Sequence, residues 1–179
     1  MERIITVFGS ARAIEGMPEY QMAYALGKEL ATKGFVVCNG GFGGTMEASA
    51  RGAKEAGGRT IGVTFHNPPR TPNPWIDEHY ELPTLIDRLL KLIEFGNAYV
   101  VLKGGTGTLL ELSAVWEFMN KKIIQEKPII TVSDFWHGVV DTLKNELLWE
   151  GMGDCTHYIH RTKTPKECAE FLADYFYIE

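Results

Sequence analysis

Short, nearly continuous apolar runs recur along the chain. Runs of this length and composition predict buried strands. They cover residues 3–8, 35–38, 60–64, 98–102 and 128–132, and we expect one further short strand near residues 157–159. Because the runs are continuous rather than alternating, they predict a mostly parallel sheet that is covered on both faces.

Between these runs, apolar residues recur every three or four positions, which predicts helices. The expected helices cover residues 18–33, 45–56, 84–95, 106–120, 136–150 and 165–175. Strands that alternate with helices predict a doubly wound, Rossmann-like α/β fold, and we expect residues 1–179 to form a single domain. In the helix at 84–95 we expect Leu85, Leu89, Leu92 and Ile93 to lie on one face and Arg88 to turn away from it.

The segment from residue 65 to residue 83 has a different composition, because it holds five of the eight prolines in the chain. Proline excludes a regular helix in this segment. We interpret it as a lid or an interface loop.

Composition and charge narrow the class of protein. The chain has 18 basic and 23 acidic side chains and a formal net charge of -5, so it has no broad basic field that would hold nucleic acid. No apolar run reaches the roughly 18 to 20 residues that a membrane-spanning helix needs. Three cysteines without a CxxC pair favour a reducing compartment, and the N-terminal residues show no secretory signal. We therefore expect a cytoplasmic protein that binds neither nucleic acid nor membranes.

Glycine is in excess at two places in the chain. There are 19 glycines, whereas average usage predicts roughly 13. Two clusters account for the excess: Gly40, Gly41, Gly43 and Gly44, then Gly104, Gly105 and Gly107. Each cluster follows a predicted strand and precedes a predicted helix, and the loop that begins at Gly9 and Ser10 also leaves a strand.

Loops that leave the carboxyl ends of parallel strands meet at the ligand crevice of such a sheet. Glycine lets the backbone approach a ligand closely, and the start of the following helix offers unpaired N–H groups to an anion. The two clusters therefore predict phosphate binding. The alternative is that the glycines only make tight turns between a strand and a helix.

The sequence excludes two common types of phosphate site. The P-loop pattern GxxxxGK[ST] is absent, because no Gly-Lys-Ser/Thr occurs in the chain. The dinucleotide pattern GxGxxG also fails, because Leu110 and Met46 stand where the third glycine is required. A mononucleotide or a similar monophosphate is the ligand that is left.

The second glycine cluster resembles a known family. Residues 104–111, Gly-Gly-Thr-Gly-Thr-Leu-Leu-Glu, resemble the GGxGTxxE core of the Lonely Guy phosphoribohydrolases, which have long been mislabelled as lysine decarboxylases. In that family an arginine stands sixteen residues before the first glycine of this core, and Arg88 stands sixteen residues before Gly104. Leu92 occupies the place of the methionine that follows the family's arginine.

The upstream part of the chain carries a second likeness to the family. Residues 40–46 resemble its GGxxGxM element, which adds Met46 to the expected site, and FGSAR resembles its first loop. The resemblance covers about residues 7–132. Three departures stand beside the motifs: Lys103 replaces a proline, Leu89 replaces a lysine, and the family's GLMG element reads Gly-Thr-Met-Glu at residues 44–47.

The resemblance implies a catalytic role for Glu111 and Arg88. It implies phosphate or nucleotide binding by the following residues: Gly9, Ser10, Gly40, Gly41, Gly43, Gly44, Met46, Gly104, Gly105, Thr106, Gly107 and Thr108. Chemistry supports the acidic residue independently, because cleavage of an N-glycosidic bond develops positive charge on the ribose, which a carboxylate stabilises. On spacing alone, Glu111 is equally a helix-dipole carboxylate and Arg88 part of a solvated helix face.

We therefore expect a hydrolase that releases a free base from a nucleoside 5'-monophosphate and leaves ribose 5-phosphate. The family also implies a homodimer or a higher homo-oligomer, with residues 109–119 as the interface. One alternative is a non-catalytic carrier of a phosphorylated small molecule, like the related molybdenum cofactor carriers; Lys103 favours it by adding a cation beside the phosphate loop. A sensor domain that uses the nucleotide as a signal is a third.

We expect neither a metal nor a cofactor. Cys155, His157 and His160 lie close together in the sequence, but no second ligand pair accompanies them, and alternation along a strand explains their spacing as well. No lysine stands out as an attachment point for pyridoxal phosphate, which a decarboxylase would need.

Overall fold

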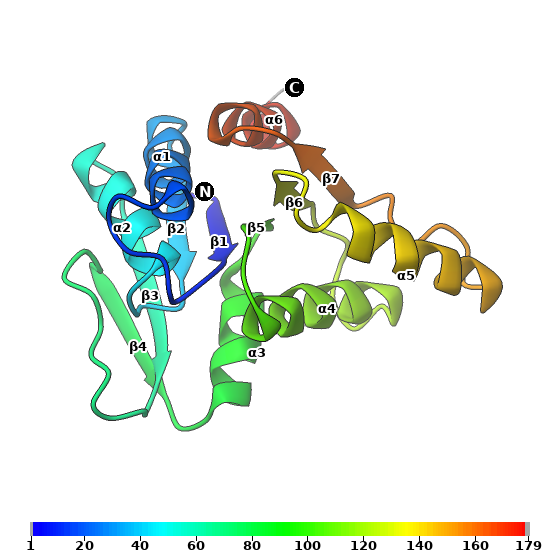
Figure 1. Ribbon diagram of the computed structural model, residues 1–179, viewed down its shortest axis with the longest axis horizontal. Coiled ribbons are helices and arrows are strands. Elements are labelled where there is room, and N and C mark those ends of the chain that lie inside the picture. Colours follow the sequence, from blue (N-terminus) through cyan, green and yellow to red (C-terminus); the bar gives the residue numbers. More distant parts are fainter. Residues whose placement is uncertain (1, 178–179) are drawn as a thin grey trace.

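A parallel sheet of seven strands organises the protein, and the structure, a computed structural model, describes residues 2–177. The strands are β1 (Ile4–Phe8), β2 (Val36–Asn39), β3 (Thr60–Phe65), β4 (Glu78–Leu82), β5 (Ala98–Val101), β6 (Ile129–Val132) and β7 (Ile159–Thr162). They lie in the order β4-β3-β2-β1-β5-β6-β7 (Figure 1), and all neighbouring pairs are parallel. The mostly parallel, doubly wound fold that the apolar runs predict is confirmed.

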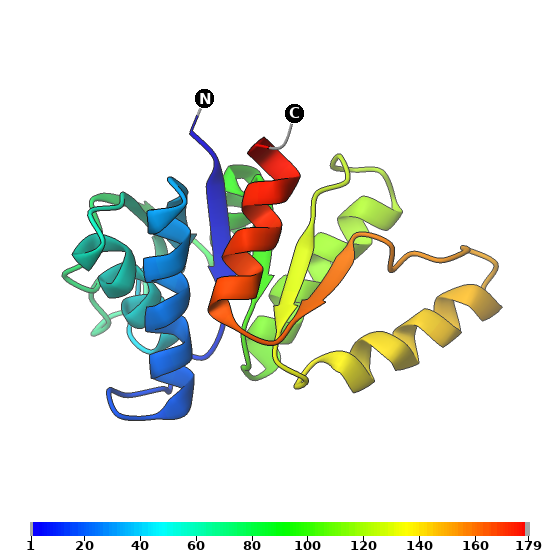
Figure 2. The same ribbon diagram turned by 90° about the horizontal axis from the view of Figure 1, so that it is seen from above.

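Helices cover both faces of this sheet. They are α1 (Pro18–Thr32), α2 (Thr45–Glu55), α3 (Leu85–Phe95), α4 (Thr106–Asn120), α5 (His137–Trp149) and α6 (Pro165–Tyr177). One apolar core lies between the sheet and α1, α2 and α6, and the other lies between the sheet and α3, α4 and α5. Figure 2 shows α1 and α6 side by side across one face. Among the described residues, no helix has the length and apolar character to cross a membrane.

The predicted element boundaries agree with the structure to within two residues for the six helices and for five of the strands. The last strand is displaced, because it spans Ile159–Thr162 rather than residues 157–159. The backbone turns at this point, where the amide of Ile159 donates to the carbonyl of Thr156, and only then pairs with β6.

The interpretation of residues 65–83 as a loop is wrong for its last part, which forms β4. This strand reads Glu-His-Tyr-Glu-Leu and lies at the edge of the sheet, where its three central residues are exposed. A half-covered edge strand needs no continuous apolar run, so the pattern that revealed the inner strands is missing here.

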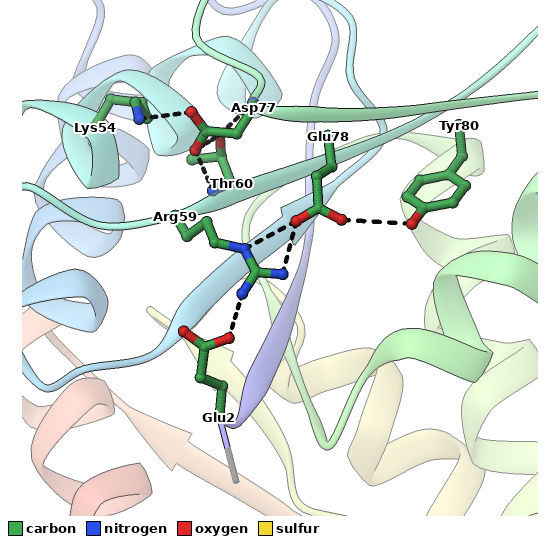
Figure 3. Close-up of polar contacts among 7 residues, drawn as sticks. All are labelled: Glu2, Lys54, Arg59, Thr60, Asp77, Glu78 and Tyr80. Carbon is green, nitrogen blue, oxygen red and sulfur yellow. Dashed lines mark hydrogen bonds and ion pairs between the residues drawn. The ribbon is translucent and has the colours of Figure 1, made fainter.

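Side chains at the start of β4 fasten it to β3. The carboxylate of Asp77 accepts a hydrogen bond from the backbone N–H of Thr60 at 2.9 Å and another from Nζ of Lys54 at 2.6 Å. At the next residue, Oε1 of Glu78 accepts hydrogen bonds from Nε and Nη2 of Arg59 at 2.8 and 2.6 Å (Figure 3). Each exposed ion pair contributes little by itself, about 0 to 1 kcal/mol, but together they fix the register of the edge strand.

Candidate functional site

A cleft of about 390 Å³ opens at the carboxyl end of β1. β1 pairs with β2 on one side and with β5 on the other, so strand order reverses at β1. Such a switch point is where open parallel sheets bind ligands. The volume falls within the range of about 300 to 1,000 Å³ that is typical of small-molecule pockets.

The N-terminus of α4 forms one wall of the cleft. The helix begins at Thr106, its N-cap Gly105 supplies no side-chain hydrogen bond, and its first turn holds no acidic residue. Its first amides therefore have no partner within the helix, and they favour an anion. A Cβ added at Gly105 or Gly107 would meet no atom within 4 Å, and both residues line the cleft, so open space adjoins this end of the helix.

Arg88 and Glu111 meet in the floor of this cleft. Nη1 of Arg88 lies 3.5 Å from Oε1 of Glu111, and the two side chains are only 9% and 13% exposed. Nε of Arg88 donates to the backbone carbonyl of Val63 in β3 at 2.8 Å. The two side chains that the sequence singled out as catalytic are thus brought together from α3 and α4.

The orientation that we expected for Arg88 is wrong. Arg88 lies on the buried face of α3 with Leu89, Leu92 and Ile93, while Leu85 is 44% exposed and borders the cleft. The guanidinium tolerates burial because the carbonyl of Val63 accepts a hydrogen bond from its Nε and the carboxylate of Glu111 pairs with its charge. It is therefore not part of a solvated helix face.

Burial dominates the electrostatics of the pair. It raises the pKa of Glu111 to about 7, although the positive charge of Arg88 acts in the opposite direction. Burial also lowers the pKa of Arg88, which the charge of Glu111 partly offsets. A carboxyl group that titrates near neutral pH inside a cleft is suited to taking up and releasing a proton.

The first glycine cluster supports the site from behind. A Cβ at Gly40 would lie 1.6 Å from Nη2 of Arg88, so only glycine leaves room for that guanidinium. Gly44 has a φ of +75°, and a Cβ there would lie 2.3 Å from the carbonyl oxygen of Ser10. The first amide of α2, that of Thr45, donates to this same oxygen at 2.8 Å. The first amide of α2 therefore already has a partner within the protein, unlike the first amides of α4.

The predicted binding residues therefore divide into two groups. Those that line the cleft are Gly9, Ser10, Met46, Gly105, Thr106, Gly107 and Thr108. Those that pack behind its lining are Gly40, Gly41, Gly43, Gly44 and Gly104. Direct ligand contact by either group stays a prediction.

Eight cleft residues were not among the predicted site residues: Val7, Phe8, Ala11, Arg12, Phe42, Phe65, Arg70 and Leu85. Arg12 follows Ser10 by two positions, so the rule that selected the first loop would have found it. Cζ of Arg70 lies 4.3 Å from the ring centroid of Phe42, and the rings of Phe42 and Phe65 pack edge to face at 6.0 Å. No local sequence signal connects Arg70 with Phe42, since 28 residues separate them.

Lys103 forms an ion pair beside the phosphate loop. Its Nζ donates to Oε1 of Glu19 on α1 at 2.7 Å, and the residue does not line the cleft. The carboxylate of Glu19 offsets part of the positive charge of Lys103, and the contribution of this residue to a carrier stays a prediction. Leu89, another departure from the family pattern, is buried in the apolar core beneath α3.

The chain is similar to known proteins in sequence and in structure. The family model described as "SLOG cluster4 family" matches residues 2–167. An uncharacterized protein from Archaeoglobus fulgidus is 32% identical over 63% of this chain and 74% of its own length. A cytokinin riboside 5'-monophosphate phosphoribohydrolase from Rhodococcoides fascians is 28% identical over 73% of this chain and 67% of its own length.

Two solved structures extend the likeness over almost the whole chain. The molybdenum cofactor binding protein from the phototrophic bacterium Rippkaea orientalis has a TM-score of 0.75 at 25% identity and covers 98% of each chain. The Moco carrier protein of Chlamydomonas reinhardtii has a TM-score of 0.69 at 25% identity and covers 96% of each chain.

Proposed function

The chain belongs to the SLOG cluster4 family, and from this membership and the geometry of the cleft we propose that it is a nucleoside 5'-monophosphate phosphoribohydrolase. It would cleave the N-glycosidic bond and leave a free base and ribose 5-phosphate. The observation that carries the proposal is the buried pair of Arg88 and Glu111 beside the uncapped N-terminus of α4. The similarity to a phosphoribohydrolase from Rhodococcoides fascians supports the same reaction.

In this proposal the amides of Thr106, Gly107 and Thr108 bind the phosphate group. Glu111 follows Thr108 by three residues, so it lies on the same side of α4, next to the ribose of a ligand held in this way. The guanidinium of Arg88 donates to ribose or phosphate oxygens with its rigid fork of N–H groups.

The reaction adds water across the glycosidic bond. The water oxygen forms a bond to the anomeric carbon of the ribose while the bond from that carbon to the base nitrogen breaks, and the electron pair goes to the base. Glu111 stabilises the positive charge on the sugar and takes up the proton of the water, and the leaving base is protonated in turn. A pKa of about 7 lets Glu111 make this exchange near neutral pH.

Release of free base from a panel of nucleoside monophosphates tests the proposal. We expect the wild-type protein to release base from at least one of AMP, GMP, IMP, CMP and UMP, measured by liquid chromatography. Glu111→Gln should lower the rate by about 10² to 10⁴, the usual contribution of general acid–base catalysis, and leave binding of ribose 5-phosphate within about threefold. If no free base is released from any of the five nucleotides, the proposed phosphoribohydrolase activity is refuted.

A second candidate is a non-catalytic carrier of a phosphorylated small molecule. It is favoured by the structural match, because two molybdenum cofactor proteins align with 98% and 96% of this chain at 25% identity. Native mass spectrometry of the purified protein separates the two functions. A phosphorylated ligand that stays bound and intact for hours would select the carrier.

We further propose that the protein acts in the cytoplasm as a homodimer. Cys38, Cys155 and Cys168 are all free, which suits a reducing compartment. Leu109 and Leu110 are 36% and 40% exposed and lie within residues 109–119, the interface that we propose.

A further inference from the structure

The cleft has a second end, across β1 from the start of α4. Phe42 follows β2, Phe65 ends β3, and Arg70 lies in the segment after β3, whereas α4 follows β5 on the other side of β1. A ligand whose phosphate binds at α4 therefore extends toward Phe42, Phe65 and Arg70. In the proposed nucleotide site this is the end that receives the base.

Arg70 is held at this end by an aromatic ring. Its Cζ lies 4.3 Å from the ring centroid of Phe42, and Cζ of Arg88 lies 5.9 Å from the same centroid. Phe42 is almost fully buried and packs against Phe65, so it is a fixed support. A guanidinium at the face of a rigid ring loses less freedom when it binds a ligand than a free surface arginine does.

Apart from the carboxylate of Glu111, which faces Arg88, the strong hydrogen-bonding groups near this end are donors, and the thioether of Met46 is only a weak acceptor. Phe42, Phe65 and Leu85 line it together with the thioether of Met46, and the strong polar groups are the guanidiniums of Arg70 and Arg88. A guanidinium has five N–H donors and no acceptor. Arg88 already has Val63, Met46 and Glu111 as partners, and its remaining donors are assigned to the ribose or the phosphate, so Arg70 is the guanidinium for the edge of the base.

We propose that Arg70 is a specificity-determining residue that selects a 6-oxopurine base, guanine or hypoxanthine, over adenine. This inference rests on the proposed function. The fork of an arginine pairs with the adjacent O6 and N7 acceptors of a 6-oxopurine, whereas adenine presents an amino group, a second donor, in place of O6. One such two-point pair discriminates between bases by about fivefold to 150-fold.

Binding measurements test the inference without depending on turnover. In the Glu111→Gln protein, which keeps the nucleotides intact, isothermal titration should give Kd values for GMP and IMP that are at least about fivefold lower than that for AMP. Arg70→Met removes every donor but keeps a long side chain, so it should bring the three Kd values within about twofold of one another. Binding of ribose 5-phosphate should change by less than about threefold, because the phosphate end is untouched. Arg70→Lys keeps donors that also pair with O6 and N7, so it should retain part of the preference.

Arg3→Met is the matched control, because Arg3 also lies over a phenylalanine, with Cζ 5.0 Å from the ring centroid of Phe176, and precedes β1 at the opposite end of the sheet. It should leave the preference for GMP unchanged. Equal binding of GMP, IMP and AMP, or a preference that survives Arg70→Met, would overturn this inference alone. If neither a mononucleotide nor ribose 5-phosphate binds, the proposed function itself fails.

Discussion

Gly40 lies directly against the guanidinium of Arg88. A Cβ on Gly40 would be 1.6 Å from Nη2 of Arg88 and 2.5 Å from Sδ of Met46. No other residue type leaves room for both groups, so the first glycine of the first cluster sets the position of an arginine that comes from a different helix. This contact accounts for the glycine at position 40, although none of the four glycines of that cluster lines the cleft.

Gly40→Ala should therefore impair the site without unfolding the protein. The atoms that the new methyl group would meet are the far ends of two flexible side chains, which can shift. A displacement of about 1 Å in a catalytic group can cost 10²-fold, so we expect kcat/KM for base release to fall by about 10- to 100-fold. Steady-state kinetics and a thermal unfolding curve check both halves of the prediction.

Gly43→Ala is the control for this substitution. A Cβ on Gly43 would have its nearest neighbour, Oε2 of Glu47, at 3.8 Å, which is an ordinary contact. The variant should keep nearly full activity. If Gly40→Ala is as active as Gly43→Ala, then Gly40 does not position Arg88.

The fold could be predicted from the sequence because its signals are local. The inner strands are continuous apolar runs and the helices repeat every three to four residues, and both patterns are written within one element. The edge strand β4 was missed because its residues face water on most sides. Residues 78–82 form a strand because they pair with β3, and this pairing cannot be predicted from the pattern of residues 78–82 alone.

The site was predicted only as far as its parts lie within one loop. The start of α4 and the place of Glu111 follow from spacing, and both lie where the sequence put them. The inward direction of Arg88 depends on Val63 and Glu111, which lie on other elements. The placement of Arg70 likewise depends on a residue that is distant in the sequence, because Arg70 lies over the ring of Phe42. Tertiary partners decide whether a charged residue is buried, and one sequence does not reveal them.

Gly107→Ala should change stability and ligand binding in opposite directions. A Cβ at Gly107 meets nothing within 4 Å, and the residue lies in the first turn of α4. Alanine in a helix is more favourable than glycine, so the free energy of unfolding should rise, by up to about 1 kcal/mol. The methyl group would occupy the open space at this end of the helix, so the Kd for ribose 5-phosphate should rise at least about tenfold, the cost of one lost charged hydrogen bond.

Gly138→Ala on α5 controls for the gain in stability. A Cβ there also meets nothing within 4 Å, and the residue does not line the cleft. Chemical denaturation should show a similar gain, while calorimetric binding of ribose 5-phosphate stays unchanged. Equal binding by Gly107→Ala and the wild-type protein would mean that the phosphate does not lie over the start of α4.

Leu110→Glu tests the proposed homodimer. Leu110 is 40% exposed on α4, and a buried, unpaired carboxylate at a subunit interface would destabilise the association. Sedimentation equilibrium should show the wild-type protein at twice the 20.0 kDa mass of the chain and the variant at that single mass. Leu148→Glu, at a residue that is 47% exposed on α5, should leave the dimer intact. A wild-type protein that sediments as a single chain would exclude the dimer.

Glu111 should make the folded protein less stable as the pH rises toward neutrality. Burial raises its pKa from an ordinary 4.5 to about 7, so the folded state binds this proton more tightly than the unfolded state does. The resulting stabilisation is fully present below about pH 4.5 and is lost as the pH rises through about 7. Glu111→Gln cannot titrate. The free energy of unfolding of the wild-type protein, minus that of the variant, should therefore fall between pH 4.5 and 8, by at most about 1.4 kcal/mol per pH unit. Urea denaturation at a series of pH values measures this difference, and a difference that stays constant or rises would show that Glu111 is ionised in the folded protein throughout that range.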